Sequence, residues 1–117
     1  MRITEIAYTE ALPVDGYGPG FFRIGGEAHD APLAILPSGI TAWAGLDDCD
    51  SLLGAAGRID VLLVGTGQEL ERLPEEFGDR LSAANIGVEA MASPQACRTY
   101  NILLGEGRRV GLALLPV

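Results

Sequence analysis

The sequence has little of what metal sites, nucleic-acid binding and membrane spans require. It contains two cysteines, Cys49 and Cys97, and one histidine, His29, at spacings that match no zinc site. It has no lysine, and its eight arginines stand against 16 acidic residues, for a formal net charge of −8. An acidic chain repels phosphate backbones, so nucleic acid and anionic membranes are not expected as partners. No apolar run approaches the roughly 20 residues that span a bilayer, so membrane insertion is not expected either.

Further absences bear on location and chemistry. The N-terminus, Met1–Glu5, lacks the apolar stretch of a signal peptide, which predicts a cytoplasmic protein with reduced cysteines. No Ser–His–Asp or Cys–His–Asn set can be assembled, and without lysine there is no Gly-x-x-x-x-Gly-Lys phosphate loop. We therefore expect no catalytic residues, no metal and no cofactor, and favour a protein that is not an enzyme.

The chain does have the apolar content of one folded domain. It has 117 residues, of which 48% are hydrophobic. This is enough for a hydrophobic core that needs no disulfide or metal to stabilise it, and the length is that of one domain rather than two. No linker composition or repeat divides it. The sequence therefore predicts a single domain over 1–117.

The first 45 residues read as β structure. Adjacent glycines, Gly25-Gly26, suit a two-residue hairpin turn, and Pro37-Ser38-Gly39 suits a second turn. Adjacent Phe21 and Phe22 must face opposite sides of a strand, so one of them needs cover from the chain's own glycine-rich loop or from a partner. The expected strands are 2–8 (Arg2 to Tyr8), 21–24, 27–29, 33–36 and 40–43.

The second half alternates helical and strand patterns. Its expected elements are a helix with a buried stripe from Cys49 to Ala56, a strand over Ile59–Val64, a helix opened by Pro74 and ended by Asn85, a strand over 87–91, a helix capped by Ser93, and a strand over 110–115. Short links between strand, helix and strand predict right-handed crossovers. The expected fold class is α/β, a single three-layer domain with a mixed, mostly parallel central sheet flanked by helices and an additional β-rich N-terminal part.

The main candidate site follows the central apolar strand. Gly65-Thr66-Gly67 stands at its carboxyl end, where open α/β sheets place their ligands. If the next strand is its parallel neighbour, Ser93 and the N–H groups of its helix lie at the same edge and could hold an anion. Gln95 and Arg98 could reach the rim. The alternative is that the glycines make a tight turn and Ser93 a helix cap, which we favour because most glycines and caps do only this.

A dinucleotide fingerprint is not supported. Gly65-x-Gly67 begins like one, but Leu70 occupies the third glycine position and Pro74 starts the helix several residues late. We therefore do not expect NAD or FAD binding.

A second candidate is a protein interface on the last helix. The 100° step places Arg98 and Asn101 away from its buried face, with Ile102 near that outer face, while Tyr100 is expected in the core with its hydroxyl on a backbone partner. Phe22 is a further candidate interface residue, because it is adjacent to Phe21 and the two side chains must face opposite sides of a strand. Cys97 falls on the buried side and is expected to be unreactive.

The chain resembles the Mth938-like (DUF498) family over nearly its whole length. The resemblance rests on Tyr17–Ile24, Gly65-Thr66-Gly67, Ile86–Met91 and Ala96–Leu104. It implies a single three-layer α/β domain with a mixed sheet. The family's eukaryotic relatives include a mitochondrial complex I assembly factor and an adipogenesis-associated protein, and it offers no catalytic residue to carry over.

Two hypotheses follow. The first is a non-enzymatic interaction or assembly-factor-like module with protein partners or a homodimer. The alternative is a protein or enzyme that binds an anion or phosphorylated metabolite at the Gly65–Gly67 and Ser93 edge.

Overall fold

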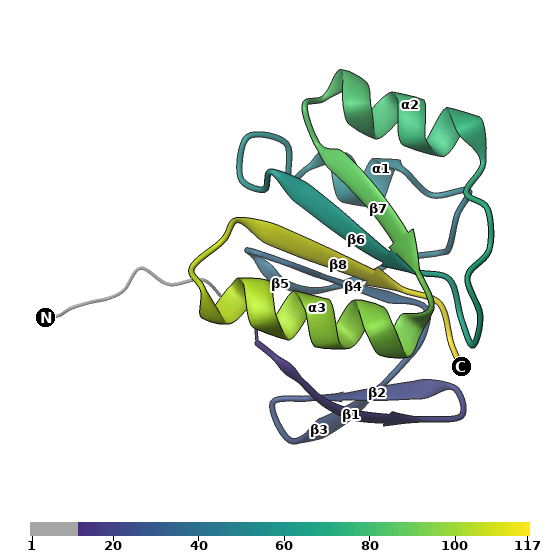
Figure 1. Cartoon of the computed structure of the whole chain (residues 1–117), viewed down its shortest axis with the longest axis vertical. Coiled ribbons are helices and arrows are strands. Elements are labelled where there is room, and N and C mark those ends of the chain that lie inside the picture. The colour runs from purple at the N-terminus through teal and green to yellow at the C-terminus, as the bar shows by residue number, and fades with distance from the viewer. Residues whose placement is uncertain (1–11) are drawn as a thin grey trace, which may run out of the picture.

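The computed structural model describes residues 12–117 (Figure 1). The strand expected over Arg2–Tyr8 lies outside the described residues. In chain order the elements are β1 (Val14–Gly18), β2 (Phe21–Ile24), β3 (Glu27–Asp30), β4 (Leu33–Leu36), β5 (Gly39–Ala42), α1 (Asp50–Leu53), β6 (Val61–Gly65), α2 (Glu75–Ala83), β7 (Gly87–Met91), α3 (Ser93–Gly105) and β8 (Val110–Leu114).

A five-stranded mixed sheet lies at the centre, with strand order β5-β4-β8-β6-β7. β6 pairs in parallel with both β7 and β8, while β4 is antiparallel to β5 and to β8. The parallel half comes from the two strand–helix–strand units and the antiparallel half from the β4–β5 hairpin. The expected mixed α/β fold is confirmed, with parallel and antiparallel pairings in equal number.

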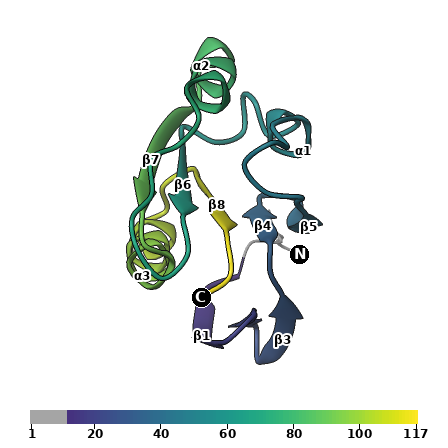
Figure 2. The same cartoon turned by 90° about the vertical axis from the view of Figure 1, so that its right-hand side faces the viewer.

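Two different layers cover the central sheet (Figure 2). On one face, α1 and α2 bury Leu52, Phe77 and Leu81 against the sheet. On the other face, α3 and the three-stranded antiparallel sheet β1-β2-β3 enclose a second core around Tyr100 and Phe22. None of the helices formed by residues 12–117 has the length and apolar character that a membrane crossing requires.

The β2–β3 hairpin confirms its turn and corrects one expectation. Gly25 and Gly26 take φ values of 61° and 86°, the left-handed conformations that a two-residue turn needs. Phe22 is fully buried in the second core. The ring of Phe21 lies over Gly18, where any side chain would collide with it. The chain's own glycine-rich loop therefore supplies the cover, and Phe22 is not an interface residue.

Two helices differ from expectation, α1 in its length and α3 in its first residue. α1 is a single turn, because Gly54 and Gly57 lower helix propensity and the chain leaves through i→i+3 bonds at Ala55 and Ala56. In α3 the N-cap is Ala92, and Ser93 is the first helical residue. The end of α2 agrees with the sequence, since Asn85 adopts a left-handed φ of 64°.

Candidate functional site

The structure brings Gly65-Thr66-Gly67 and Ser93 together. β6 and β7 are parallel neighbours, and Gly65 pairs with Met91 at their common carboxyl edge. The Ser93 N–H donates to the Gly67 carbonyl at 2.7 Å, and the Gly67 N–H donates to Ser93 Oγ at 2.9 Å. The proximity that the parallel arrangement predicted is therefore present.

The Ser93 hydroxyl is used for internal connection. It is 0% exposed, and while it accepts from Gly67 it donates to the Leu115 carbonyl at 2.8 Å. One oxygen thus ties the end of β6, the start of α3 and the segment after β8. Because its hydrogen bonds are made within the chain, this hydroxyl is not offered to a ligand.

The Thr66 hydroxyl organises the loop that leads to α2. It donates to the Glu69 carbonyl at 2.8 Å and accepts from the Glu71 N–H at 2.9 Å. Its backbone N–H donates to the Met91 carbonyl at 2.9 Å. The residue is buried. Thr66 therefore holds a loop in place.

Gly65 is required by packing. A Cβ at this position would lie 2.7 Å from Ser93 Cα and 2.8 Å from Leu114 Cδ2. The missing side chain lets α3 begin directly against the strand end. Gly67 has a φ of 106°, which a residue with a side chain rarely adopts.

The first turn of α3 retains little capacity to bind an anion. The Ser93 N–H is bonded to Gly67, Pro94 has no N–H, and the Ala96 N–H donates to the Ala92 carbonyl at 2.9 Å. Of the N–H groups in this turn, only that of Gln95 has no backbone acceptor among residues 12–117. The geometry gives these residues a packing role, and ligand binding at this edge stays a prediction.

Asn101 has a different role from the one its helical position suggested. It is half-buried, and its side-chain amide bonds both backbone groups of Val14, so it is corrected from an interface residue to an internal link. A detectable signal existed, because Asn101 lies four residues after Cys97 and borders the buried stripe. Tyr100 is buried as expected, and its hydroxyl donates to the Leu12 carbonyl at 3.2 Å.

The outer face of α3 carries the remaining candidates. Gln95, Arg98 and Ile102 are exposed, and Ile102 is 61% exposed. We call these three residues the α3 face. Beside it, between β1 and α3, lies a hollow of about 210 Å³ lined by Arg98 and Tyr17 among others. Tyr17 is 49% exposed and was missed from the sequence because it stands in a glycine-rich segment that suggested only a loop.

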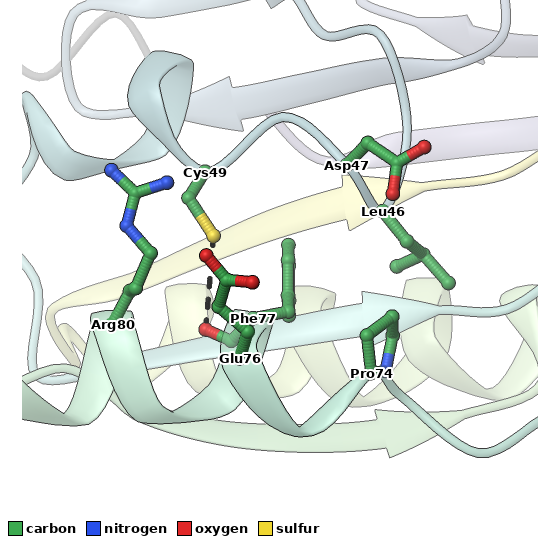
Figure 3. Close-up of a pocket in the computed structure, with 7 residues that line it drawn as sticks. All are labelled: Leu46, Asp47, Cys49, Pro74, Glu76, Phe77 and Arg80. Carbon is green, nitrogen blue, oxygen red and sulfur yellow. Dashed lines mark hydrogen bonds between the residues drawn. The ribbon is translucent and has the colours of Figure 1, made fainter.

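The cysteines have the burial of structural residues. Burial raises the pKa of Cys97 to about 12, which leaves its thiol protonated at neutral pH. Burial also raises the pKa of Cys49, whose thiol lies 3.8 Å from the Phe77 carbonyl (Figure 3). The hollow beside Cys49 measures only about 90 Å³, and the arginine that lines it, Arg80, is paired with Asp50 at 2.7 Å.

Residues 12–117 contain no group of three or more His, Cys, Asp or Glu side chains placed to hold a metal.

Comparison with known proteins shows the family. The model of "Protein of unknown function (DUF498/DUF598)" matches residues 14–115. The chain belongs to the DUF498 family. Similar DUF498 relatives include an uncharacterised protein of Rhodobacter capsulatus, 46% identical over 100% of this chain and 94% of that protein. The human NADH dehydrogenase [ubiquinone] 1 alpha subcomplex assembly factor 3 is 35% identical over 92% of this chain. The chain spans 62% of the length of that human relative.

Solved structures agree with this DUF498 fold. A crystal structure described as an outer membrane protein from Bartonella henselae has a TM-score of 0.86 and 37% identity, covering 95% of this chain and 99% of that one. The solution structure of a Mth938-like domain from Bordetella pertussis has a TM-score of 0.75 and 32% identity, covering 99% and 92%. The Mth938-like fold inferred from the sequence is confirmed.

Proposed function

We propose that this DUF498 domain is a non-enzymatic interaction module that helps other proteins assemble, and that it docks them on the α3 face. The observation that carries the proposal is that Arg98 and Ile102, four residues apart and therefore on the same side of α3, are both exposed. Interfaces are enriched in arginine and place apolar side chains at their centre. The neighbouring hollow at Tyr17 offers a recess for a partner side chain.

Two further facts support an interaction role over a chemical one. The hydroxyls of Ser93 and Thr66 are engaged in hydrogen bonds to the chain's own backbone. The cysteine thiols are held protonated by burial, which raises the pKa of each.

A relative of 35% identity, the human protein, carries an assembly-factor name. We extend that role to this chain as a proposal, and we propose the cytoplasm as its location.

The test is photo-crosslinking in the native cell with a benzophenone amino acid placed at Ile102. Leu70 is the matched control position, because it is 64% exposed and belongs to the loop before α2. We expect discrete crosslinked products from position 102 that disappear when Arg98→Glu is added, and none of those products from position 70.

The products also identify the kind of partner. A crosslink to a second copy of the chain assigns the α3 face to a homodimer, and a crosslink to another protein supports the assembly role. Equal patterns from positions 102 and 70, or no product from 102, would contradict the proposal.

A further inference from the structure

Figure 1 shows where α3 ends and the chain turns into β8. A hollow of about 240 Å³ lies at this turn. Segments far apart in the sequence build it, from the β4–β5 turn, the loop before β6 and the turn before β8. Its lining residues are Pro37, Arg58, Leu104, Gly107, Arg108, Arg109 and Val110. We call it the arginine hollow.

The floor of the arginine hollow is apolar and firmly held. Val110 is buried in the second core, and Leu104 is half-buried against the same core. Pro37 is also half-buried. An apolar group that entered the hollow would therefore leave water and contact a fixed apolar surface, which favours binding.

The rim concentrates positive charge. Arg109 is fixed in place, because its Nη2 donates to the Gly57 carbonyl at 3.0 Å and to Asp60 Oδ1 at 3.2 Å. Arg58 and Arg108 are exposed, and neither forms an ion pair with any residue of 12–117. Three of the eight arginines thus meet here in a chain of net charge −8, and Asp60 offsets the charge of Arg109 alone.

This local charge decides what the hollow attracts. At physiological ionic strength, charges more than about 8 Å away are largely screened, so an approaching group responds to the rim rather than to the acidic remainder of the surface. Arginine also pairs with carboxylates through two parallel hydrogen bonds. The rim therefore favours acidic groups.

The volume decides the size of the occupant. Sites that bury drug-sized ligands measure about 300–1,000 Å³, and the arginine hollow is smaller than this. A volume of about 240 Å³ suits one apolar side chain projecting from a larger partner. An anchor side chain in a pocket, with arginine beside it, is the arrangement typical of interface hot spots.

We propose that the arginine hollow docks a partner-protein segment in which one apolar side chain is flanked by acidic residues. The apolar side chain enters between Leu104 and Val110, and its acidic neighbours pair with Arg58 and Arg108. This rests on the proposed function only in taking the partner to be a protein, since the α3 face is a separate surface.

The test is an NMR titration of the ¹⁵N-labelled full chain with the synthetic peptide acetyl-Asp-Glu-Leu-Glu-Asp-amide. We expect saturable shifts at the amides of Leu104, Gly107, Arg108 and Val110. The double variant Arg58→Gln and Arg108→Gln should weaken the affinity at least tenfold. The matched double variant Arg23→Gln and Arg72→Gln, also of exposed arginines, should leave it unchanged.

Two peptide controls separate the apolar from the ionic contribution. Replacing the peptide leucine by serine, or its acids by their amides, should each reduce the affinity at least fivefold. Equal affinity of the serine peptide would contradict the role of an apolar side chain in the hollow. Chemical shifts that do not saturate at millimolar peptide would contradict the proposal that the hollow is a binding site.

The outcomes also distinguish this proposal from the first. Peptide shifts centred on Arg98 and Ile102 would overturn the arginine hollow and support the α3 face. Saturable shifts at the hollow, with no crosslinks from position 102, would support the hollow and contradict the α3 face.

Discussion

The Asn101 side chain holds the backbone of Val14 through two hydrogen bonds. The Val14 N–H donates to Oδ1 at 2.8 Å, and Nδ2 donates to the Val14 carbonyl at 2.9 Å. The amide thus occupies the place that a neighbouring strand would take beside β1. Because Val14 begins the three-stranded sheet and its side chain is buried, this one residue links α3 to the layer that covers the second core.

Replacing Asn101 by alanine should therefore destabilise the fold. Two backbone groups of a buried residue would lose their partners, which costs about 2 kcal/mol in the free energy of unfolding. Urea denaturation measures the change. Gln95→Ala, on the exposed side of the same helix, is the control and should stay within about 0.5 kcal/mol. Equal effects of the two variants would contradict the link.

Gly65 and Gly78 should respond oppositely to alanine. At Gly65 the new Cβ would lie 2.6 Å from Ser93 Oγ and 2.7 Å from its Cα, so α3 must shift, and we expect a loss of at least about 2 kcal/mol. At Gly78, inside α2, a Cβ meets nothing within 4 Å, and Gly78→Ala should stabilise by about 0.5–1 kcal/mol. Thermal unfolding of both variants measures this, and a neutral Gly65→Ala would contradict the packing role.

These residues mark the limit of what the sequence predicts. The turn at Gly25-Gly26 and the helix end at Asn85 were predictable because each signal acts within a few residues of chain. Ser93 was recognised as polar and near a helix start, but its hydroxyl bonds a carbonyl 22 residues away. The Asn101 amide bonds a residue 87 positions away. Such partners are set by tertiary packing, which no local pattern encodes.

In the candidate site, too, local sequence signals were predictable and the consequences of tertiary packing were not. Parallel pairing of β6 and β7 was predictable from the strand–helix–strand order, and it placed Gly65 and Ser93 at one edge. Whether that edge is open depends on how α3 and β8 pack together, and a Cβ at Gly65 would collide with Ser93 and Leu114 at that contact. The arginine hollow was not predictable, because Arg58 and Arg108 meet only after the chain folds.

Asp48 should stabilise the turn before α1. Its carboxylate accepts from the Ala44 N–H at 3.0 Å and from the Ser51 N–H at 3.1 Å and hydroxyl at 2.7 Å. These hydrogen bonds, led by that from Ala44, lower the pKa of Asp48. Asp48→Ala should therefore cost about 1 kcal/mol at neutral pH, as loss of a cap does. Asp47→Ala, at the exposed neighbour, is the control and should have little effect.

The pH dependence follows from the sign of that shift. Because the pKa of Asp48 is lower in the folded chain, its stabilisation is present above the unfolded value near 3.8 and is lost as the pH falls through the folded value. The difference between wild type and Asp48→Ala should thus shrink in acid. Denaturation curves from pH 7 down to pH 3 measure it, and a difference that stays constant would contradict the role of the ionised carboxylate.

Cys97 should make the protein less stable in alkali. Burial raises the pKa of Cys97 from 9.0 to about 12, so between these values the unfolded chain loses a proton that the folded chain keeps. The free energy of unfolding should therefore fall as the pH rises above about 9, by up to about 1.4 kcal/mol per pH unit for this thiol. Cys97→Ala should reduce that slope, whatever its effect on stability at neutral pH. Denaturation of both proteins between pH 8 and pH 10.5 measures the slopes, and identical slopes would show that the Cys97 thiol ionises as readily in the folded chain as in the unfolded one.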